Sequence, residues 1–384
     1  MGRYFITGGG TGGHIYPAIA VANALFDDEI FYIGNPKNLE YDVVKKKGFK
    51  FLPVCVSAMP RTLSLRLIKF LWQLFVSILK CCYYILHYKP DAIFGTGGYV
   101  SAPALIAANI LKVPYMMHDC DAQPGIVSRK LSFSAKYISV AFESACKFLN
   151  NKNCFVNGNP IRIEFQVLSK ETARNNLNLQ DKLTLCIMGG SQGARSINDA
   201  SVMILKKLFE NYDIQIIFQT GKKNYERVIE QLIRVYPEYG SNSNLLVQPY
   251  FDDMIYPLKA ADIVVSRAGS LILSEINICG LPAILVPYPH AAADHQRKNA
   301  KEAEKAGYAV WCDDSQFDGQ ELQRILYSLL QYLINVVCPI YILNRHEIRK
   351  LRDHYNHRNS FRIIQMISFC LNYNFLECFY LYDI

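Results

Sequence analysis

Acidic residues are missing from one long stretch of the chain, between Val43 and Pro90. Lysine and arginine are frequent in the same stretch, so the net charge of +8 is partly concentrated there. A one-sided basic segment favours an anionic partner: a membrane surface, a nucleic acid or an anionic substrate. The missing acids therefore indicate where an anion binds and leave its class open.

Long apolar runs and paired cysteines are also missing. The longest uncharged run of the apolar segment within the basic stretch, Phe70 to Leu79, is too short for a bilayer span, which needs about 20 residues. The twelve cysteines form no C-x-x-C pair and no zinc-finger spacing, which argues against a zinc site. Because no signal peptide precedes the first apolar run, we expect reduced thiols and a cytoplasmic protein.

The basic stretch itself predicts a helix from Leu63 to Leu79 that is rich in apolar and aromatic residues. Arg66, Lys69 and Lys80 interrupt its apolar character. Such a helix fits the headgroup region of a membrane, with Trp72 at the apolar boundary. A helix packed against a sheet is the alternative, and the missing acids favour membrane contact.

Glycine-rich loops that follow short apolar runs are abundant. Tyr4 to Ile6 predicts a strand, Gly8 to Gly13 a tight loop, and the residues from Pro17 a helix with proline in its first turn. Glycines at a helix start admit a ligand close to the backbone, and the unpaired N–H groups there favour a phosphate. The same design recurs in three further segments: Ala92 to Tyr99, Leu183 to Ala194 and Asp262 to Gly269.

This repetition, in a chain of 384 residues with 51% apolar residues, predicts an α/β fold of two doubly wound domains. The turn-rich segment Gly158 to Arg162 is the expected boundary. We therefore expect domains at 1–162 and 163–330, followed by a divergent tail at 331–384.

Polar residues stand where two of the predicted strands end. His118, Asp119 and Asp121 follow one strand, at the edge where an open α/β sheet places its ligand. An ordinary capped loop and a two-carboxylate metal site are the alternatives there, and no other hard ligand is near. In the second half, Ser270 is expected to cap a helix in which Glu275 accepts hydrogen bonds from ribose hydroxyls, and Gln296 suits a sugar.

Taken together, these motifs resemble the MurG family of glycosyltransferases, within family 28. The segments that carry the resemblance are Gly9–His14, Gly97–Ser101, Gly158–Arg162, Gly189–Ala194, Asp252–Met254, Ser266–Gly269 and Ser274–Glu275. The resemblance implies the GT-B fold, with two Rossmann-like domains facing a cleft. It assigns the lipid acceptor and the membrane to the first domain and the UDP-sugar to the second.

The implied reaction is inverting transfer of N-acetylglucosamine from UDP-GlcNAc to the C4 hydroxyl of undecaprenyl-diphosphate-MurNAc-pentapeptide, which converts lipid I to lipid II. The implied location is the cytoplasmic face of the bacterial inner membrane, with an anionic surface as partner, possible contacts to cell-wall synthesis proteins, and no nucleic acid. No cofactor and no metal are expected.

The resemblance also assigns residues. His14 and Asp119 are the expected catalytic groups, with His14 as base or electrostatic helper. The acceptor diphosphate is assigned to Gly10, Gly97, Gly98 and Tyr99. The expected UDP-GlcNAc contacts are Thr11, Gly12, Gly13, Asp121, Arg162, Ser191, Phe251 (through its backbone, to uracil), Ser270, Leu271, Glu275 and Gln296.

Two departures from the family pattern stand out. The family's His-Glu-Gln-Asn is replaced here by His118-Asp119-Cys120-Asp121, and an acid near a diphosphate predicts weaker donor binding than asparagine. The tail is either a lineage-specific membrane or interdomain element or the product of a shifted reading frame. The alternatives for function are another UDP-sugar transferase with a lipid acceptor, and a non-catalytic UDP-sugar-binding scaffold.

Overall fold

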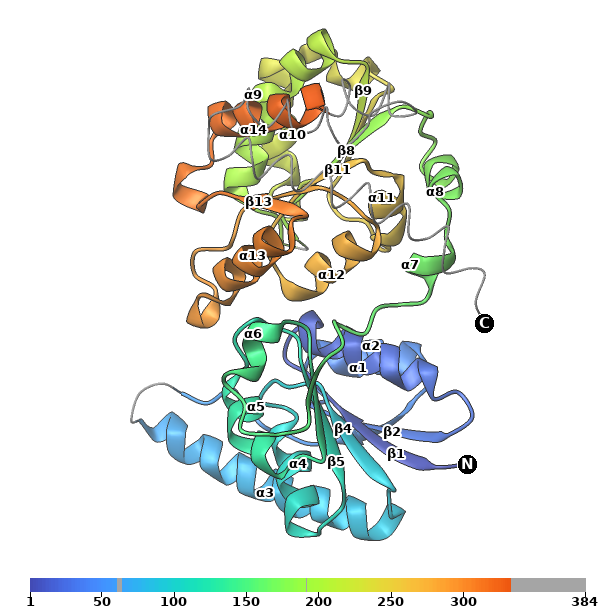
Figure 1. Ribbon diagram of the computed structural model, residues 1–384, viewed down its shortest axis with the longest axis vertical. Coiled ribbons are helices and arrows are strands. Elements are labelled where there is room, and N and C mark those ends of the chain that lie inside the picture. The colour runs from blue at the N-terminus through green and yellow to red at the C-terminus, as the bar shows by residue number, and fades with distance from the viewer. Residues whose placement is uncertain (61–63, 191, 333–384) are drawn as a thin grey trace, which may run out of the picture. The chain divides into compact units, whose positions relative to one another are not determined.

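The computed structural model describes residues 1–60, 64–190 and 192–332 of the chain. The chain forms two compact units that divide after Arg162 (Figure 1). Ser191 and most of the expected tail, residues 333–384, lie outside the described residues.

Unit 1 is built on a parallel sheet with the strand order β3-β2-β1-β4-β5-β6-β7. Its strands are β1 (Arg3–Thr7), β2 (Glu29–Gly34), β3 (Lys50–Pro53), β4 (Ala92–Gly95), β5 (Tyr115–Asp119), β6 (Tyr137–Val140) and β7 (Cys154–Val156). Its helices are α1 (Gly12–Ala24), α2 (Leu39–Lys46), α3 (Leu65–Tyr88), α4 (Ala102–Ile110), α5 (Ile126–Leu131), α6 (Glu143–Cys146) and the 3₁₀ turn η1 (Ser132–Ser134). The chain reverses its direction of winding at β1, which lies between β2 and β4.

Unit 2 repeats this design with the strand order β10-β9-β8-β11-β12-β13. Its strands are β8 (Leu183–Met188), β9 (Ile214–Gln219), β10 (Leu245–Gln248), β11 (Ile263–Ser266), β12 (Ala283–Leu285) and β13 (Ala309–Trp311). Its helices are α7 (Glu164–Val167), α8 (Lys170–Asn176), α9 (Arg195–Asn211), α10 (Tyr225–Val235), α11 (Ile255–Ala260), α12 (Ser270–Ile278), α13 (His295–Ala306) and α14 (Gly319–Tyr332). Short 3₁₀ turns are η2 (Pro237–Ser241), η3 (Ala292–Asp294) and η4 (Asp314–Gln316).

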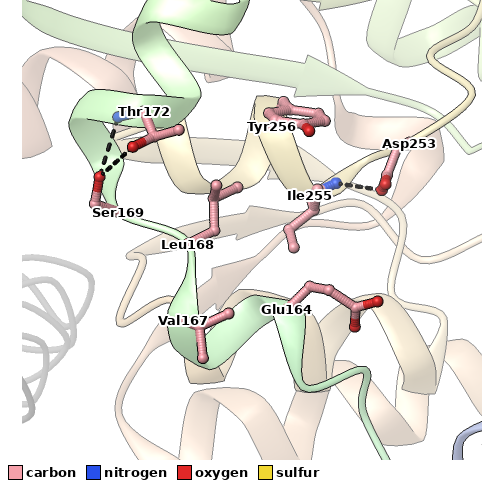
Figure 2. A pocket seen from close by; sticks show the side chains of 8 residues that line it. All are labelled: Glu164, Val167, Leu168, Ser169, Thr172, Asp253, Ile255 and Tyr256. Atoms are coloured by element: carbon pink, nitrogen blue, oxygen red, sulfur yellow. Dashed lines mark hydrogen bonds between the residues drawn. The ribbon is translucent and has the colours of Figure 1, made fainter. Parts of the chain in front are cut away.

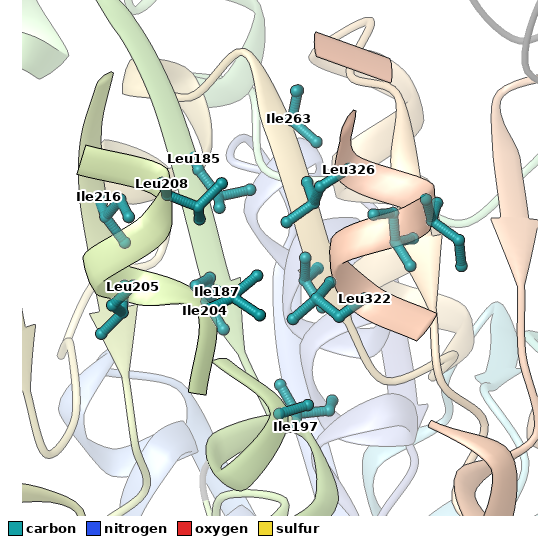
Figure 3. Close-up of a cluster of buried hydrophobic side chains, with 14 of the residues drawn as sticks. Leu185, Ile187, Ile197, Ile204, Leu205, Leu208, Ile216, Ile263, Leu322 and Leu326 are labelled. Carbon is teal, nitrogen blue, oxygen red and sulfur yellow. The ribbon is translucent and has the colours of Figure 1, made fainter. Parts of the chain in front are cut away.

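Helices pack on both faces of each sheet, which explains the continuous apolar runs in the sequence. At the β5–β7 end of the first sheet, Met116, Tyr137 and Phe155 are exposed. In unit 2, side chains of β8 such as Leu185 and Ile187 pack against Leu208 of α9 and Leu326 of α14 (Figure 3). Full burial of each such side chain stabilises the fold by roughly 1.5–3 kcal/mol. The prediction of two doubly wound α/β units is confirmed.

Some elements differ from the sequence-based prediction. Helix α1 begins at Gly12, so the placement of Pro17 in its first turn was wrong, and Pro17 lies inside the helix. The amides of His14 and Ile15 donate to the Thr11 carbonyl at 3.1 and 3.2 Å, which starts the helix within the glycine run. Glycines of low helix propensity are therefore held helical by the surrounding structure.

Helix α3 runs to Tyr88, well past the predicted end, and it has two apolar faces. One face, with Phe70, Cys81 and Ile85, is buried. The other is exposed at Leu65, Ile68, Trp72, Phe75, Leu79, Tyr83 and Leu86. The alternative of a helix packed against the sheet therefore holds for the buried face, and membrane contact of the exposed face stays a prediction.

The cysteines differ from expectation at one place. A disulfide joins Cys146 to Cys154, so the expectation of reduced thiols fails for this pair. Across the described ranges, no helix is both long enough and apolar enough to cross a bilayer.

Candidate functional site

Three loops of unit 1 meet at the carboxyl edge of its sheet. In the parallel register Thr7 of β1 pairs with Gly95 of β4, and Gly95 pairs with Met117 of β5. The segments that follow these strands therefore share one edge, where the winding reverses and open α/β sheets bind ligands. The expected grouping of the first two glycine loops with the segment after β5 is present within this unit.

His14 lies at the centre of this group, in the first turn of α1. Its Nδ1 is 2.9 Å from the Thr96 carbonyl oxygen and 3.9 Å from the Cys120 sulfur. A Cβ added at Gly98 would lie 3.0 Å from the ring carbon Cδ2, and one at Gly97 would lie 3.4 Å from Nδ1. Two glycines of the second loop thus leave the space that the imidazole fills.

A buried carboxylate, Glu40, lies against the first glycine loop, and the sequence analysis missed it. Its Oε2 accepts from the Gly10 amide at 3.3 Å, and its Oε1 accepts from the Asn35 amide at 3.1 Å. A Cβ at Gly9 would lie 2.6 Å from Oε1, so Gly9 is needed for a protein group and not only for a ligand. In sequence, Glu40 is an acid in the first turn of a helix, where acids are common.

Other protein groups also fill the space around this loop. The Tyr32 hydroxyl donates to the Gly8 carbonyl at 2.6 Å. Gly10, at φ +88°, lies against the Tyr99 ring, whose hydroxyl oxygen accepts from the side-chain Nδ2 of Asn38 at 3.2 Å. The loop is therefore an ordered support whose free edge is the start of α1, where Thr11 is exposed and Gly12 and Gly13 are partly exposed.

Asp119 and His118 are both buried, and they hold the loop that follows β5. Asp119 accepts from the amides of Asp121 and Gly125, at 3.2 and 3.1 Å. Burial raises the pKa of Asp119 above its ordinary value, and the charge of Asp121 raises it further. Both Asp119 oxygens therefore accept backbone N–H groups, while Asp121 remains partly exposed.

The neighbouring His118 is neutral. Its Nε2 lies 2.8 Å from Asn159 Oδ1, and its Nδ1 lies 3.1 Å from Ser139 Oγ. Burial lowers the pKa of His118 to about 4. The side chain thereby ties β5 and β6 to the turn that leads into Arg162, itself half-buried.

Unit 2 contains a cavity of about 820 Å³ at the carboxyl edge of its own sheet. The lining includes Gly189 and Gly190 after β8, Gln219 at the end of β9, Gly269 before α12, and Gln296 of α13. Gly190 has φ +84° and open space where a side chain would stand, whereas Gly193 is packed against the Thr220 carbonyl. Gly190 is thus the glycine of this loop that leaves room for a ligand.

Gln219 lines this cavity, bonds one of its glycines to the segment after β10, and was not singled out from the sequence. Its Oε1 accepts from the Phe251 amide at 2.9 Å, and its Nε2 donates to the Gly190 carbonyl at 3.4 Å. The resemblance assigns a backbone contact of Phe251 to uracil, and the backbone N–H of this residue is already bonded to the Gln219 side chain. The carbonyl oxygen of Phe251 is therefore the backbone group of this residue that a base would contact.

Arg267 is a second residue to which the sequence analysis gave no role. Its Nη1 donates to the carbonyls of Val286 and Pro287 at 3.0 and 3.2 Å and to Asp314 at 2.5 Å. The Ser196 hydroxyl donates to the same carboxylate oxygen at 2.5 Å. This largely buried cation fixes the loops after β11 and β12, and the ion pair that it forms with Asp314 is part of the cavity wall.

The remaining expected donor contacts are placed unequally. Gln296 lines the cavity, and its Oε1 accepts from the Tyr288 amide at 2.9 Å. Ser270 is the first residue of α12 and not its cap, because Gly269 takes that position. Among the described residues, the lining includes Ile272 but neither Leu271 nor Glu275.

A second hollow of about 410 Å³ lies in unit 2, between α7, α8 and α11 (Figure 2). Its polar groups serve local turns: Ser169 accepts from the Thr172 amide and Asp253 from the Ile255 amide, both at 3.1 Å. Val167 and Leu168 add an aliphatic wall, so the hollow offers no cradle for a phosphate. Within residues 1–60, 64–190 and 192–332, no group of three His, Cys, Asp or Glu side chains is placed to hold a metal.

Comparison with known protein families gives two matches. Residues 4–140 match the glycosyltransferase family 28 N-terminal domain, and residues 184–333 match the glycosyltransferase family 28 C-terminal domain. The two matches fall on either side of the division after Arg162.

Similar curated proteins carry one name, UDP-N-acetylglucosamine--N-acetylmuramyl-(pentapeptide) pyrophosphoryl-undecaprenol N-acetylglucosamine transferase. The protein of Desulforamulus reducens is 40% identical over 335 residues, which cover 86% of this chain and 90% of that protein. The protein of Halothermothrix orenii is 37% identical over 334 residues, 85% of this chain and 90% of that one.

Among solved structures, MurG of Acinetobacter baumannii is similar with a TM-score of 0.67 and 26% identity, covering 86% of this chain and 91% of that chain. A UDP-GlcNAc 2-epimerase from Neisseria meningitidis has a TM-score of 0.60 at 15% identity, over 97% of this chain and 99% of that chain. The second likeness concerns the fold alone, and the first agrees with the GT-B class.

Proposed function

The chain belongs to glycosyltransferase family 28, and on that premise we propose that it transfers N-acetylglucosamine from UDP-GlcNAc to the muramyl C4 hydroxyl of lipid I, forming lipid II for peptidoglycan. The observation that carries the proposal is the match to transferases named for this reaction over 90% of their length. The two sites described above supply the chemical roles.

In unit 1, His14 takes the proton of the acceptor hydroxyl. The hydroxyl oxygen attacks the anomeric carbon, the bond from that carbon to the diphosphate breaks with its electron pair, and the configuration inverts. Asp119 acts indirectly. It accepts hydrogen bonds from the backbone amides of Asp121 and Gly125 and so fixes the loop that carries Cys120 and Asp121. The loops that carry Gly10, Gly97, Gly98 and Tyr99 receive the acceptor diphosphate.

In unit 2, the cavity receives the donor. Gly190 and the start of α9 suit a phosphate group, because N–H groups at a helix start favour negative charge. Gln296 meets the sugar hydroxyls through its amide. Phe251 and Glu275, which are not part of the cavity lining, are the proposed contacts to uracil and ribose beside it. Arg162 and the loop that includes Ser191 stabilise the diphosphate as UDP leaves.

The exposed face of α3 binds the anionic surface of the inner membrane from the cytoplasm. Leu65, Ile68, Trp72, Phe75 and Leu79 follow one another at three- and four-residue steps, so they form one stripe on the helix. Arg66, Lys69 and Lys80 are exposed beside it, and acids are missing from the surrounding sequence. Apolar burial and attraction to anionic lipid act together on such a surface.

Flotation with vesicles tests the membrane contact. The wild type is expected to float with anionic vesicles, and the pair Trp72→Ser and Phe75→Ser is expected to stay at the bottom. The matched control is Ile233→Ser with Val235→Ser, two exposed apolar residues of α10 in unit 2. Equal flotation of the two double variants, or failure of the wild type to float at low salt, contradicts the membrane proposal.

Transfer of labelled N-acetylglucosamine from UDP to a short-chain lipid I analogue tests the reaction, with diacylglycerol as the competing acceptor. Product from lipid I alone is expected. Product from diacylglycerol alone supports a different lipid-acceptor transferase, and donor binding without any product supports a scaffold.

A further inference from the structure

Thr96 lies directly after β4, fully buried, and it contacts His14 through both its backbone and its side chain. We propose that Thr96 is a positioning residue for His14. Thr96 fixes the tautomer and the backbone of this histidine, so that its Nε2 presents a lone pair. This inference rests on the proposed function, because it gives the proposed base its required protonation state.

The tautomer follows from the chemistry of the contact. The Thr96 carbonyl oxygen, 2.9 Å from Nδ1, accepts hydrogen bonds and donates none. Nδ1 must therefore carry the hydrogen for this contact to be favourable. A neutral imidazole has only one N–H, so Nε2 is left as the nitrogen with a free lone pair.

The backbone of His14 is held by the same residue. The Thr96 hydroxyl donates to the His14 carbonyl at 2.5 Å, and the Thr96 amide donates to the Thr7 carbonyl at 2.9 Å. A Cβ at Gly8 would lie 1.9 Å from this hydroxyl, so the glycine is required by the contact. Thr96 thus links the end of β1 to the first turn of α1.

The His14 ring has little room to rotate between Thr96, Gly97 and Gly98. Gly97 and Gly98 both have positive φ, +86° and +73°, and they turn the second loop closely past the imidazole. With its Nδ1 edge on the Thr96 carbonyl and its carbon edge on Gly98, the ring is held on two sides.

The contact between His14 and Thr96 also suits the proton transfer. As the acceptor oxygen bonds to the anomeric carbon, its proton moves to Nε2, and UDP departs with the electrons of the broken bond. The resulting imidazolium keeps its Nδ1–H on the Thr96 carbonyl, where the hydrogen bond becomes charge-assisted and stronger. Thr96 contacts neither substrate and acts only through His14.

Nitrogen NMR of the ¹⁵N-histidine-labelled protein tests the tautomer without any acceptor. The His14 signals are assigned by their loss in His14→Gln. We expect a protonated Nδ1 and an unprotonated Nε2 in the neutral state. The reverse tautomer, or an even mixture of the two, overturns the proposal.

Kinetics test the hydroxyl. Thr96→Val is expected to lower kcat by roughly ten- to a hundredfold, the order of a mispositioned general base, while the KM for UDP-GlcNAc stays within about twofold. Thr96→Ser, which keeps the hydroxyl, should recover most of the rate. Thr7→Val is the matched control, because it removes another buried hydroxyl that donates to a carbonyl, Ile33 at 3.0 Å, away from the histidine.

The proposal is wrong if Thr96→Val and Thr7→Val lose equal activity, or if the loss appears in KM. Should Thr96→Val fail to fold, the serine variant and the NMR tautomer still decide the matter. If the wild type has the expected tautomer but transfers nothing to lipid I, the proposed function is wrong. The role of Thr96 in fixing the His14 tautomer is then still supported.

Discussion

The glycine loops after β1 and β8 occupy equivalent places in their two sheets, and they do different work. Around the first loop, protein groups fill the space: Glu40 lies at Gly9, and Tyr99 lies at Gly10. Beside the second loop, Gly190 faces open space, and the cavity has a volume of about 820 Å³. One loop therefore supports a histidine, and the other leaves room for a ligand.

The difference between the two loops shows that a glycine-rich loop is not by itself a phosphate site. Both loops follow a strand and precede a helix, so their sequences support the same interpretation. What separates them is the identity of the groups that reach the loop from distant parts of the chain.

His14→Ala is expected to abolish most of the transfer activity. Loss of a general base lowers kcat by roughly a hundred- to ten-thousandfold, while donor binding in unit 2 is kept. Turnover of UDP-GlcNAc with the lipid I analogue measures this. A variant that keeps more than about a tenth of the wild-type kcat shows that the first loop does not support the base.

The buried His118 of unit 1 makes the free energy of unfolding depend on pH. The folded pKa of His118 is lowered from 6.5 to about 4, so the unfolded state binds its proton more readily between these values. The free energy of unfolding therefore falls as the pH drops from 6.5 to 4, by roughly 3 kcal/mol from this group. His118→Gln removes this component.

Urea unfolding at a series of pH values measures the His118 effect as the difference between the two proteins. The difference is needed because Asp119, whose pKa is raised, contributes with the opposite sign. Identical pH slopes in the two proteins contradict the assignment of His118 as a neutral residue.

Gly8→Ala tests how tightly the first loop is filled. The new methyl group would meet the Thr96 hydroxyl and the His14 carbonyl, at 1.9 and 2.7 Å. Overpacking of this kind destabilises by roughly 1–3 kcal/mol. Gly125→Ala, with open space at its Cβ in the same unit, is the matched control in thermal unfolding, and equal melting temperatures of the two variants contradict the filled-loop description.

Asp121→Asn is expected to have the smallest effect. Removal of a partly exposed negative charge should lower the KM for UDP-GlcNAc about two- to fivefold, since surface charges contribute roughly 1 kcal/mol or less. An unchanged or higher KM shows that Asp121 does not repel the donor diphosphate.

The sequence was a good guide to regular, local features. Short apolar runs such as Leu183–Met188 and Tyr115–Asp119 are strands, as their composition predicted. The loop after the first was recognised from its glycines, and the segment at the end of the second from its polar residues. Strands β2, β3, β6, β7 and β13 were not anticipated, because they are only three to six residues long and show no clear period-two pattern.

Contacts between distant positions were beyond the sequence. The Glu40 bond to Gly10 spans 30 positions, and the Gln219 bond to Phe251 spans 32. Neither residue forms a motif with its partner, so nothing local predicts the pair. The start of α1 was misplaced for the same reason, because tertiary contacts hold Gly12 and Gly13 in the helix against their propensity.

The most direct test of the division of roles is calorimetric titration of UDP into the wild type, His14→Ala and Gly190→Ala. The account predicts a Kd within about twofold of the wild type for His14→Ala, and binding weakened by roughly tenfold or more for Gly190→Ala, whose added methyl group enters the cavity loop at a positive φ of 84°. Weakened binding in His14→Ala together with unchanged binding in Gly190→Ala would contradict it.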